Sequence, residues 1–290
     1  MAAVQAEQPV GDVVDPNLGG AYAPDLYSPT RTADLLPHVA ALGEAAVRRY
    51  REQGFLGIER VFDQDDIQAG LNGLDDLLAG KNPAYNGVML EKAAVDESDT
   101  LRARLDRVRK LFLFVKYDAR LEALSRHPAV LAVVRTLLGG REPVLFQDMA
   151  LLKPPQIGRE KPWHQDHAYF DLPLDEKVVG VWIALDRATL DNGCMQFLAG
   201  GHRDGPQPHW MRRDWQICDT QMAGKHSVAC PLPPGGAVFF DSLLPHGTPQ
   251  NTSPDRRRAL QFHYVAQGAA LVPTEERMRV FGTEGKNVTC

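Results

Sequence analysis

The sequence predicts a mainly β fold in which α-helices flank a jelly-roll core. The first half of the 290-residue chain repeats its apolar residues with a helical period. The second half is a series of short apolar or alternating runs bounded by Pro, Gly, Asn or Asp, which is typical of an antiparallel sandwich or barrel. No long helical pattern separates these runs, which argues against a parallel sheet with crossover helices.

The first half predicts an arm followed by helices. Residues 1–32 are rich in Pro, Gly, Asp and Ala and carry no sustained period, so we expect an irregular N-terminal arm. Residues 33–140 predict mostly helical support for the core. We expect one helix within 33–54 that ends at a glycine, one within 63–80 whose first turn is acidic, and two or three more within 101–140.

The second half predicts the core itself. We expect residues 141–268 to form the jelly roll and residues 269–290 a C-terminal tail, within a single domain that spans residues 1–290. The runs that predict its strands are "PVLFQDMALLKP" (143–154), "KVVGVWIALD" (177–186), "CMQFL" (194–198), "HSVACPL" (226–232), "GAVFFDS" (236–242) and "RRALQFHYVAQ" (257–267).

Composition narrows the class of protein. The net charge of -5 gives no basic field that would indicate a nucleic-acid partner. No apolar run approaches the roughly 18 residues of a membrane span, and the N-terminus lacks the regions of a signal peptide, so we expect a cytoplasmic protein without a membrane partner. The four cysteines, Cys194, Cys218, Cys230 and Cys290, show no CxxC spacing and predict reduced thiols. The sequence does not specify the oligomeric state.

A cluster of histidines and aspartates in "WHQDHAYFDL" (163–172) indicates a metal site. In an extended strand, residues two apart face the same side. His164 and Asp166 are therefore expected to project together, while Gln165 and the rival ligand His167 point away. By itself this HxD pattern also fits a strand end in a solvated loop, so the rest of the sequence has to decide.

We predict His246 as the distal ligand of a site with two histidines and one carboxylate. It follows an apolar strand and precedes a loop rich in Pro, Asn and Ser. Such a triad leaves coordination positions open, as Fe(II) requires for oxygen and a chelating co-substrate, whereas four ligands close a structural zinc site. A second HxD, His202 and Asp204 in "GGHRDG", is flanked by glycines and predicts a turn.

An arginine follows the distal histidine. The loop "TPQNTSPD" (248–255) predicts a hairpin, after which the chain should run antiparallel to the strand of His246. Read with period two, one face of that strand is small and polar and consists of Arg257, Ala259, Gln261 and His263. The other face is largely apolar and consists of Arg256, Arg258, Leu260, Phe262 and Tyr264. A buried Arg257 near the metal needs an anion, which a dicarboxylate co-substrate supplies. Three consecutive arginines alone also fit a solvated strand start.

In combination these motifs resemble the phytanoyl-CoA dioxygenase family of Fe(II)- and 2-oxoglutarate-dependent oxygenases. The resemblance covers about residues 50–268 and rests on "WHQD" (163–166), "NGCMQFLAGGH" (192–202), "FFDSLLPHGT" (239–248) and "RRAL" (257–260). The family places an arginine eleven residues after the distal histidine, and 246 + 11 = 257. The resemblance implies a double-stranded β-helix, which is a cupin-like jelly roll, with flanking helices.

The resemblance also implies which residues bind the cofactors. The family's Fe(II) ligands fall on His164, Asp166 and His246. The residues that bind 2-oxoglutarate fall on Arg257, Thr248, Trp182, Gln147 and Lys110. One departure is "LAGGH" (198–202), where the family usually has a Pro-Gly-Ser-His turn. The matching His202 then has a structural role.

The implied reaction is the oxidation, most simply the hydroxylation, of a small-molecule substrate with O2 and release of succinate and CO2. Related halogenases lack the carboxylate, so Asp166 implies oxygenation rather than halogenation. Two alternatives stand beside this hypothesis. One is a non-catalytic jelly-roll protein that binds a metal or ligand, and the other is a cupin-type metalloenzyme that does not use 2-oxoglutarate. The intact triad disfavours the first, and the arginine at family spacing disfavours the second.

The substrate is not specified by the sequence, because the family covers acyl-CoA, ectoine-type and secondary-metabolite substrates. The insertion 205–226 is expected either to cap the site or to form a surface loop with tryptophan anchors. The basic stretch 102–110 either meets CoA phosphates or forms a solvated helix face. The candidate substrate-facing residues are His209, Trp210, Trp215, Tyr169 and Phe170.

Overall fold

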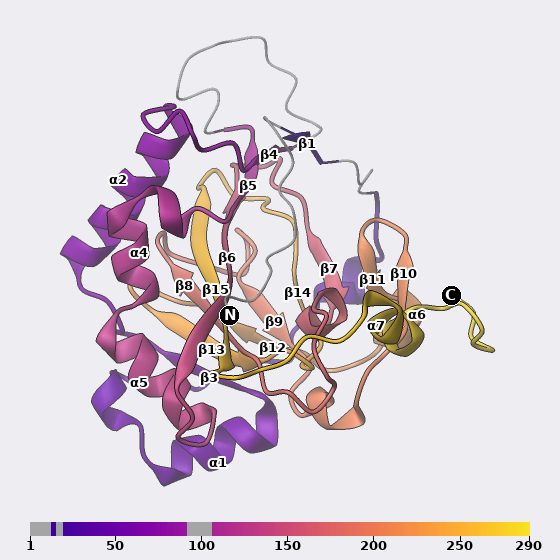
Figure 1. Cartoon of the computed structure of the whole chain (residues 1–290). Helices are drawn as coiled ribbons and strands as arrows, with labels where there is room; N and C mark the ends of the chain where they lie inside the picture. Colours follow the sequence, from indigo (N-terminus) through magenta and orange to yellow (C-terminus); the bar gives the residue numbers. More distant parts are fainter. Residues whose placement is uncertain (1–12, 16–19, 92–105) are drawn as a thin grey trace.

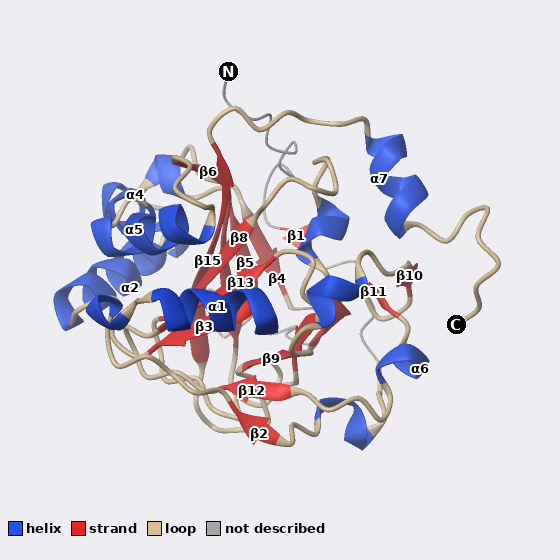
Figure 2. Ribbon diagram, turned by 90° about the horizontal axis from the view of Figure 1, so that it is seen from below, coloured by secondary structure: helices blue, strands red, loops and turns tan. Residues whose placement is uncertain are grey.

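Two β-sheets face each other, and helices cover the outer face of the larger sheet (Figure 1, Figure 2). The computed structural model describes residues 13–15, 20–91 and 106–290. In this part of the chain the larger sheet has eight strands in the order β1-β4-β5-β6-β15-β8-β13-β3, and the smaller has five in the order β2-β12-β9-β14-β7. A β-sandwich flanked by helices confirms the predicted fold class.

The strands of the larger sheet come from both halves of the sequence. Its long central pair, β6 and β15, is antiparallel, and β8 pairs with the other edge of β15. The strands are β1 (Val13–Val14), β3 (Phe55–Ile58), β4 (Val88–Leu90), β5 (Val108–Phe112), β6 (Pro143–Lys153), β8 (Val179–Ala184), β13 (Ala237–Asp241) and β15 (Arg257–Ala266).

The smaller sheet is built from short strands, and the helices lie outside both sheets. Its strands are β2 (Arg31–Thr32), β7 (Lys161–His164), β9 (Met195–Phe197), β12 (Val228–Cys230) and β14 (His246–Thr248), and a separate hairpin pairs β10 (His209–Met211) with β11 (Trp215–Ile217). The α-helices are α1 (Glu44–Gln53), α2 (Gln64–Leu78), α4 (Ala119–Ser125), α5 (Pro128–Leu137), α6 (Asp219–Met222) and α7 (Thr274–Phe281).

Two apolar clusters hold these layers together. One joins the helices to the outer face of the larger sheet and includes Leu74, Val134 and Phe262. The other fills the space between the sheets, where Phe55 and Phe197 stack with ring centroids 4.6 Å apart. Because side chains alternate along each strand, the larger sheet buries apolar residues on both faces.

The predicted helices are confirmed, with one change of boundary. Helix α2 begins at a capping box in which Asp63 and Asp66 each accept a hydrogen bond from the other's backbone N–H. Helix α1 ends at Gly54, which adopts a left-handed conformation with φ 85°. It begins only at Glu44 rather than near residue 33, because Gly43 occupies the N-cap position and Pro37 interrupts the preceding pattern.

The sequence between 101 and 140 contains helices α4 and α5, as predicted, but also a strand that the helical pattern did not predict. Strand β5 pairs with β4 on one side and β6 on the other, so both of its edges are hydrogen-bonded. The interpretation of 102–110 as a helix face is therefore wrong at residues 108–110, while residues 102–105 lie outside the described part. The predicted arm lies partly outside it too, at 1–12 and 16–19.

The loop 248–255 is not the predicted hairpin. Strand β14 belongs to the smaller sheet and β15 to the larger, and the two do not pair. The buried Asn251 explains the path, because its side-chain amide donates to the carbonyls of Lys153 and Pro154 at the end of β6. These bonds carry the chain from one sheet to the other, so His246 and Arg257 face the same interior from opposite layers.

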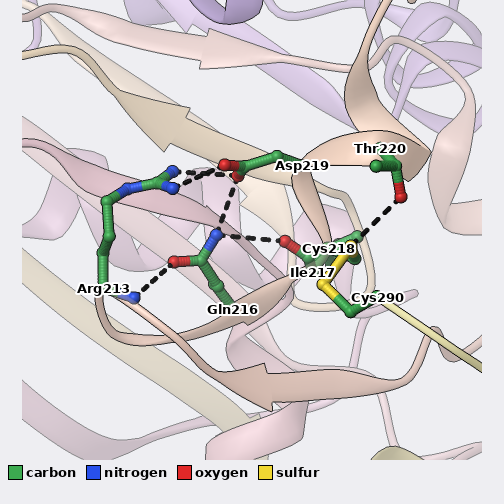
Figure 3. Close-up of a disulfide and its surroundings, with 7 residues drawn as sticks. All are labelled: Arg213, Gln216, Ile217, Cys218, Asp219, Thr220 and Cys290. Atoms are coloured by element: carbon green, nitrogen blue, oxygen red, sulfur yellow. Dashed lines mark hydrogen bonds and ion pairs between the residues drawn. A yellow bond between two sulfur atoms is a disulfide. The ribbon is translucent and has the colours of Figure 1, made fainter. Parts of the chain in front are cut away.

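The expectation of four reduced thiols is wrong for one pair. Cys218 and Cys290 form a disulfide, whereas Cys194 and Cys230 are buried free thiols. The two bonded residues are 72 positions apart, so no short spacing pattern could reveal the pair. Figure 3 shows that the bond joins the chain's C-terminal end to the start of α6, beside the β11 residue Ile217.

No helix in the described ranges reaches the length and apolar character that a membrane crossing requires.

The disulfide yields a stability prediction. It closes a loop of 72 residues, for which the lost entropy of the unfolded chain amounts to about 4 kcal/mol. We expect Cys290→Ser to lower the free energy of unfolding by up to that amount in urea titrations without reductant. With dithiothreitol, the wild-type protein should match the variant. Equal stability of the oxidised wild-type protein and the variant would contradict the assignment.

Candidate metal centre

Strand pairing brings the two predicted histidine ligands together. His164 at the end of β7 is the direct partner of His246 at the start of β14 in the antiparallel register of the smaller sheet. Their ring centroids lie 4.3 Å apart. The Nδ1 atom of His164 lies 2.7 Å from the Pro162 carbonyl oxygen, and that of His246 lies 2.9 Å from the Leu244 carbonyl oxygen. Because a carbonyl only accepts, each Nδ1 carries the hydrogen and each Nε2 offers a lone pair.

The carboxylate of Asp166 faces both lone pairs. Its Oδ1 lies 3.2 Å from Nε2 of His164 and 3.6 Å from Nε2 of His246. All three side chains are buried, and one potential ligand atom from each lies within 4.8 Å of the others. Among the described residues, no fourth His, Cys, Asp or Glu joins this group.

The predicted grouping is confirmed, but strand parity is not its cause. Strand β7 ends at His164, and Asp166 begins a 3-10 helix, Asp166–Tyr169. His167 points away, with Nδ1 3.0 Å from Oγ of Ser242, and the buried Gln165 binds the carbonyls of Gly205 and Leu243. These outward contacts turn the chain after the strand and place Asp166 beside His164. The second HxD lies in a 3-10 turn, Gly201–Asp204, as predicted, and His202 contacts the Arg51 carbonyl.

The protonation states suit a metal ion. Burial and the neighbouring His246 lower the pKa of His164 to about 3, and burial also lowers the pKa of His246. Burial alone would raise the pKa of Asp166, but the surrounding imidazoles of His246, His263 and His164 hold it well below its usual value. Neutral imidazoles and an ionised carboxylate are the forms that bind a divalent cation.

The triad opens onto a cavity of about 310 Å³ between the sheets. Arg257 lies on β15 at another part of its wall and is only 2% exposed. Its Nη1 donates to the Leu151 carbonyl, but its Nε has no hydrogen-bond partner. No carboxylate of the described residues pairs with this guanidinium, and burial lowers its pKa to about 9. A buried cation of this kind needs an anion from outside the chain.

Of the other residues that the resemblance assigned to 2-oxoglutarate, three line the same cavity, and Trp182 lies behind Arg257 rather than on the described lining. Trp182 packs under Arg257, whose guanidinium carbon lies 5.3 Å from the ring centroid, and the buried indole N–H has no acceptor. Thr248, Gln147 and Lys110 line the cavity. Burial and the charge of Lys161 lower the pKa of Lys110 to about 8.

The remaining cavity cations already have partners within the chain. Arg109 and Arg159 both pair with Asp15 and with the buried Glu91. Lys153 donates to the carbonyls of Arg159, Thr248 and Pro249. Lys161 pairs with Asp214 at 2.7 Å. Among the described residues, Arg257, Lys110 and Lys153 are therefore the cavity cations without a carboxylate partner, and of these Lys153 is already bound by three backbone carbonyls.

The candidate substrate residues divide into two groups. Tyr169 and Phe170 line the cavity, whereas His209, Trp210 and Trp215 are not among its described lining residues. His209 instead accepts a hydrogen bond from the Gln165 N–H, and the Trp215 carbonyl accepts one from the Tyr169 hydroxyl. The insertion 205–226 thus packs against the metal-binding loop as a hairpin.

Sequence reasoning missed several residues of the site. His263 and Gln261 both contact the Asp166 carboxylate, and Asp214 of the insertion reaches the cavity. The period-two pattern of the last strand did place His263 and Gln261 on the cavity face, so the signal was present. The pattern could not predict which residues of the opposite sheet contact that face.

Comparisons with known proteins agree with this geometry. The family model described as phytanoyl-CoA dioxygenase matches residues 50–259. Phytanoyl-CoA dioxygenase domain-containing protein 1 of Rattus norvegicus is 25% identical over 286 residues, covering 82% of this chain and 97% of that protein. The peroxisomal phytanoyl-CoA dioxygenase of Mus musculus is 26% identical over 252 residues, covering 82% of this chain and 71% of that protein.

A solved structure shows the same arrangement of the chain. EvdO2 from Micromonospora carbonacea var. aurantiaca, crystallised with 2-oxoglutarate, is 25% identical to this chain and superimposes with a TM-score of 0.63. The match covers 83% of this chain and 97% of EvdO2.

The site predicts metal-dependent stabilisation. A metal ion at 100 times its Kd should raise the free energy of unfolding by about 2.7 kcal/mol, measured with Fe(II) under argon. Asp166→Asn should remove most of this shift, because it removes the only anionic ligand. Asp204→Asn, in the second HxD, is the matched control and should keep it. Loss of the shift in both variants, or in neither, would refute the assignment.

Proposed function

Because the chain belongs to the phytanoyl-CoA dioxygenase family, we propose that it is an Fe(II)- and 2-oxoglutarate-dependent oxygenase that hydroxylates a small molecule. The observation that carries this proposal is the pairing of two buried sites in one cavity. At one site, two imidazoles and a carboxylate offer lone pairs to a cation. At the other, Arg257 offers a guanidinium without a carboxylate partner to an anion.

His164, Asp166 and His246 would hold the iron, and their chemistry fits that metal. Two nitrogen donors and one carboxylate form the facial triad of non-haem Fe(II) oxygenases, which leaves positions open on the cavity side. The Nδ1 contacts of both histidines to backbone carbonyls fix the ring orientations before any metal arrives.

Arg257 and Thr248 would hold the distal carboxylate of 2-oxoglutarate. Arg257 lines this part of the cavity, and its Nε and the indole N–H of Trp182, which packs against it, have no acceptor among the described residues. Lys110 and Gln147 would hold the keto-acid end. EvdO2, the relative whose structure contains 2-oxoglutarate, supports this co-substrate.

When bound, iron and 2-oxoglutarate supply the oxidising power, with O2 consumed and succinate and CO2 released. The chain supplies orientation and a dry environment. Arg257 fixes one end of the co-substrate, while the buried walls of both sheets exclude water from the reacting atoms. Lys110, which also lines the cavity, would contribute a positive charge to the keto-acid end.

The substrate would enter on the side of the cavity that the metal and co-substrate residues leave open. Met89, Phe112, Met149 and Phe170 give this side an apolar surface, and the Tyr169 hydroxyl accepts a hydrogen bond from Lys161 at its edge. The ionised Asp166 occupies the ligand position that halogenases leave for halide, so we propose hydroxylation as the outcome.

The direct test is turnover of 2-oxoglutarate without substrate. We expect the air-exposed protein to release succinate only with added Fe(II). His164→Ala should reduce that rate to background, because it removes one of three protein ligands. Folded protein that yields no iron-dependent succinate, and no visible band when Fe(II) and 2-oxoglutarate are mixed under argon, would indicate a binding protein or an enzyme that does not use 2-oxoglutarate.

Arg257 gives a separate prediction with a matched neighbour. Losing hydrogen bonds to a charged group costs about 1.5–3 kcal/mol. Arg257→Gln should therefore weaken 2-oxoglutarate binding by tenfold to about 150-fold, measured from the anaerobic visible band. Arg256→Gln alters an arginine that pairs with Asp106 instead and should leave the Kd unchanged. Equal affinity in both variants would rule out the proposed role of Arg257.

A further inference from the structure

The two oxygens of Asp166 have different surroundings. Oδ1 faces Nε2 of His164 and Nε2 of His246, at 3.2 and 3.6 Å. Oδ2 faces the opposite direction, where Nε2 of His263 lies at 2.7 Å and Nε2 of Gln261 at 3.2 Å. One oxygen is therefore free to meet a cation, and the other is occupied by two groups of the chain.

Both of these groups come from the cavity face of β15. Residues 261 and 263 lie two apart on this strand, opposite Trp182 and Gly180 of β8. The two Nε2 atoms are 3.2 Å from each other and converge on the same oxygen. Because β15 belongs to the larger sheet and Asp166 follows a strand of the smaller sheet, these bonds span the interior of the sandwich.

His263 has a single direction in which to donate. It is fully buried, and its ring packs edge-on against Phe170 at 4.9 Å. Its Nδ1 has no hydrogen-bond partner, so both of its polar contacts, with Asp166 at 2.7 Å and with Gln261 at 3.2 Å, are made through Nε2. An ionised carboxylate only accepts, so Nε2 of His263 is the donor in its contact with Asp166.

We propose that His263 and Gln261 are positioning residues that hold Asp166 as a one-oxygen metal ligand and thereby keep a coordination position open. This inference rests on the proposed function, because it takes Asp166 as an iron ligand. The carboxyl torsion of an aspartate is soft, so without these two bonds the group could turn and offer both oxygens to the ion.

The number of ligands makes this constraint consequential. An octahedral ion accepts six ligand atoms. With a one-oxygen Asp166 the chain supplies three, and a chelating keto acid brings two, which leaves one further position. A carboxylate that binds through both oxygens would occupy that position. Holding Oδ2 on β15 prevents this without adding any group to the metal itself.

The test compares variants by Co(II) binding to the metal-free protein, because the visible spectrum of Co(II) reports its coordination. His263→Phe keeps a ring between the same neighbours and removes the donor. His263→Gln retains a donor of similar reach, and Gln261→Met removes the second donor. The control is His202→Phe, since His202 belongs to the second HxD and contacts the Arg51 carbonyl instead of the Asp166 carboxylate.

We expect His263→Phe to weaken Co(II) binding by 10- to 100-fold, the usual effect of removing a group that orients a metal ligand, and to change the spectrum. His263→Gln should restore most of the lost affinity, because its amide offers a donor to the same oxygen. Gln261→Met should show a smaller loss, and His202→Phe should retain the wild-type spectrum. Circular dichroism checks the fold of each variant, and Gln261→Met decides the matter should His263→Phe not fold.

Three results would overturn the inference. A folded His263→Phe variant with wild-type affinity and spectrum would show that the hydrogen bond does not position Asp166. A His263→Gln variant as weak as His263→Phe would show that the ring, not the donor, matters. A wild-type protein that binds neither Co(II) nor Fe(II) would overturn the proposed function as well, which separates that failure from the first two.

Discussion

The structure depends on the charge of Asp166, which lies in an apolar sandwich at only 4% exposure. An unpaired buried carboxylate would cost several kcal/mol, so the fold has to surround it with partners. These partners come from three strands, with His164 on β7, His246 on β14, and His263 and Gln261 on β15. Because β7 and β14 belong to one sheet and β15 to the other, the carboxylate joins the two layers as well as forming the site.

The cavity also contains a buried positive charge, the guanidinium of Arg257. Arg257 lies on the same face of β15 as Gln261, four residues before it, and its guanidinium packs over Trp182. The cavity thus has a surplus of acceptors at one end and of donors at the other. A cation with a dicarboxylate chelated to it satisfies both ends, whereas a neutral ligand would leave Arg257 without an anion. Strand β15 is the element that fixes this spacing, since it supplies a donor to each end.

Features that depend on short stretches of sequence could be predicted from the sequence alone. Strand and helix signals predicted the fold class, and the position of His246 before a turn identified the distal histidine. The pairing of β14 with β7 rather than β15, the strand at Val108–Phe112 and the Cys218–Cys290 bond were not predicted, because each depends on partners far away in sequence. His263 belongs to the same class. The sequence placed His263 on the polar face of the last strand, but its contact with Asp166 depends on how the two sheets pack against each other.

In the proposed function, one cavity binds iron at the Asp166 end and the distal carboxylate of 2-oxoglutarate at Arg257. A crystal structure of the protein grown under argon with Fe(II) and 2-oxoglutarate, with anomalous data at the iron edge, tests this most directly. We expect an iron peak bound by Nε2 of His164, Nε2 of His246 and Oδ1 of Asp166, with the distal carboxylate on Arg257. Iron bound elsewhere, or 2-oxoglutarate away from Arg257, would contradict the account.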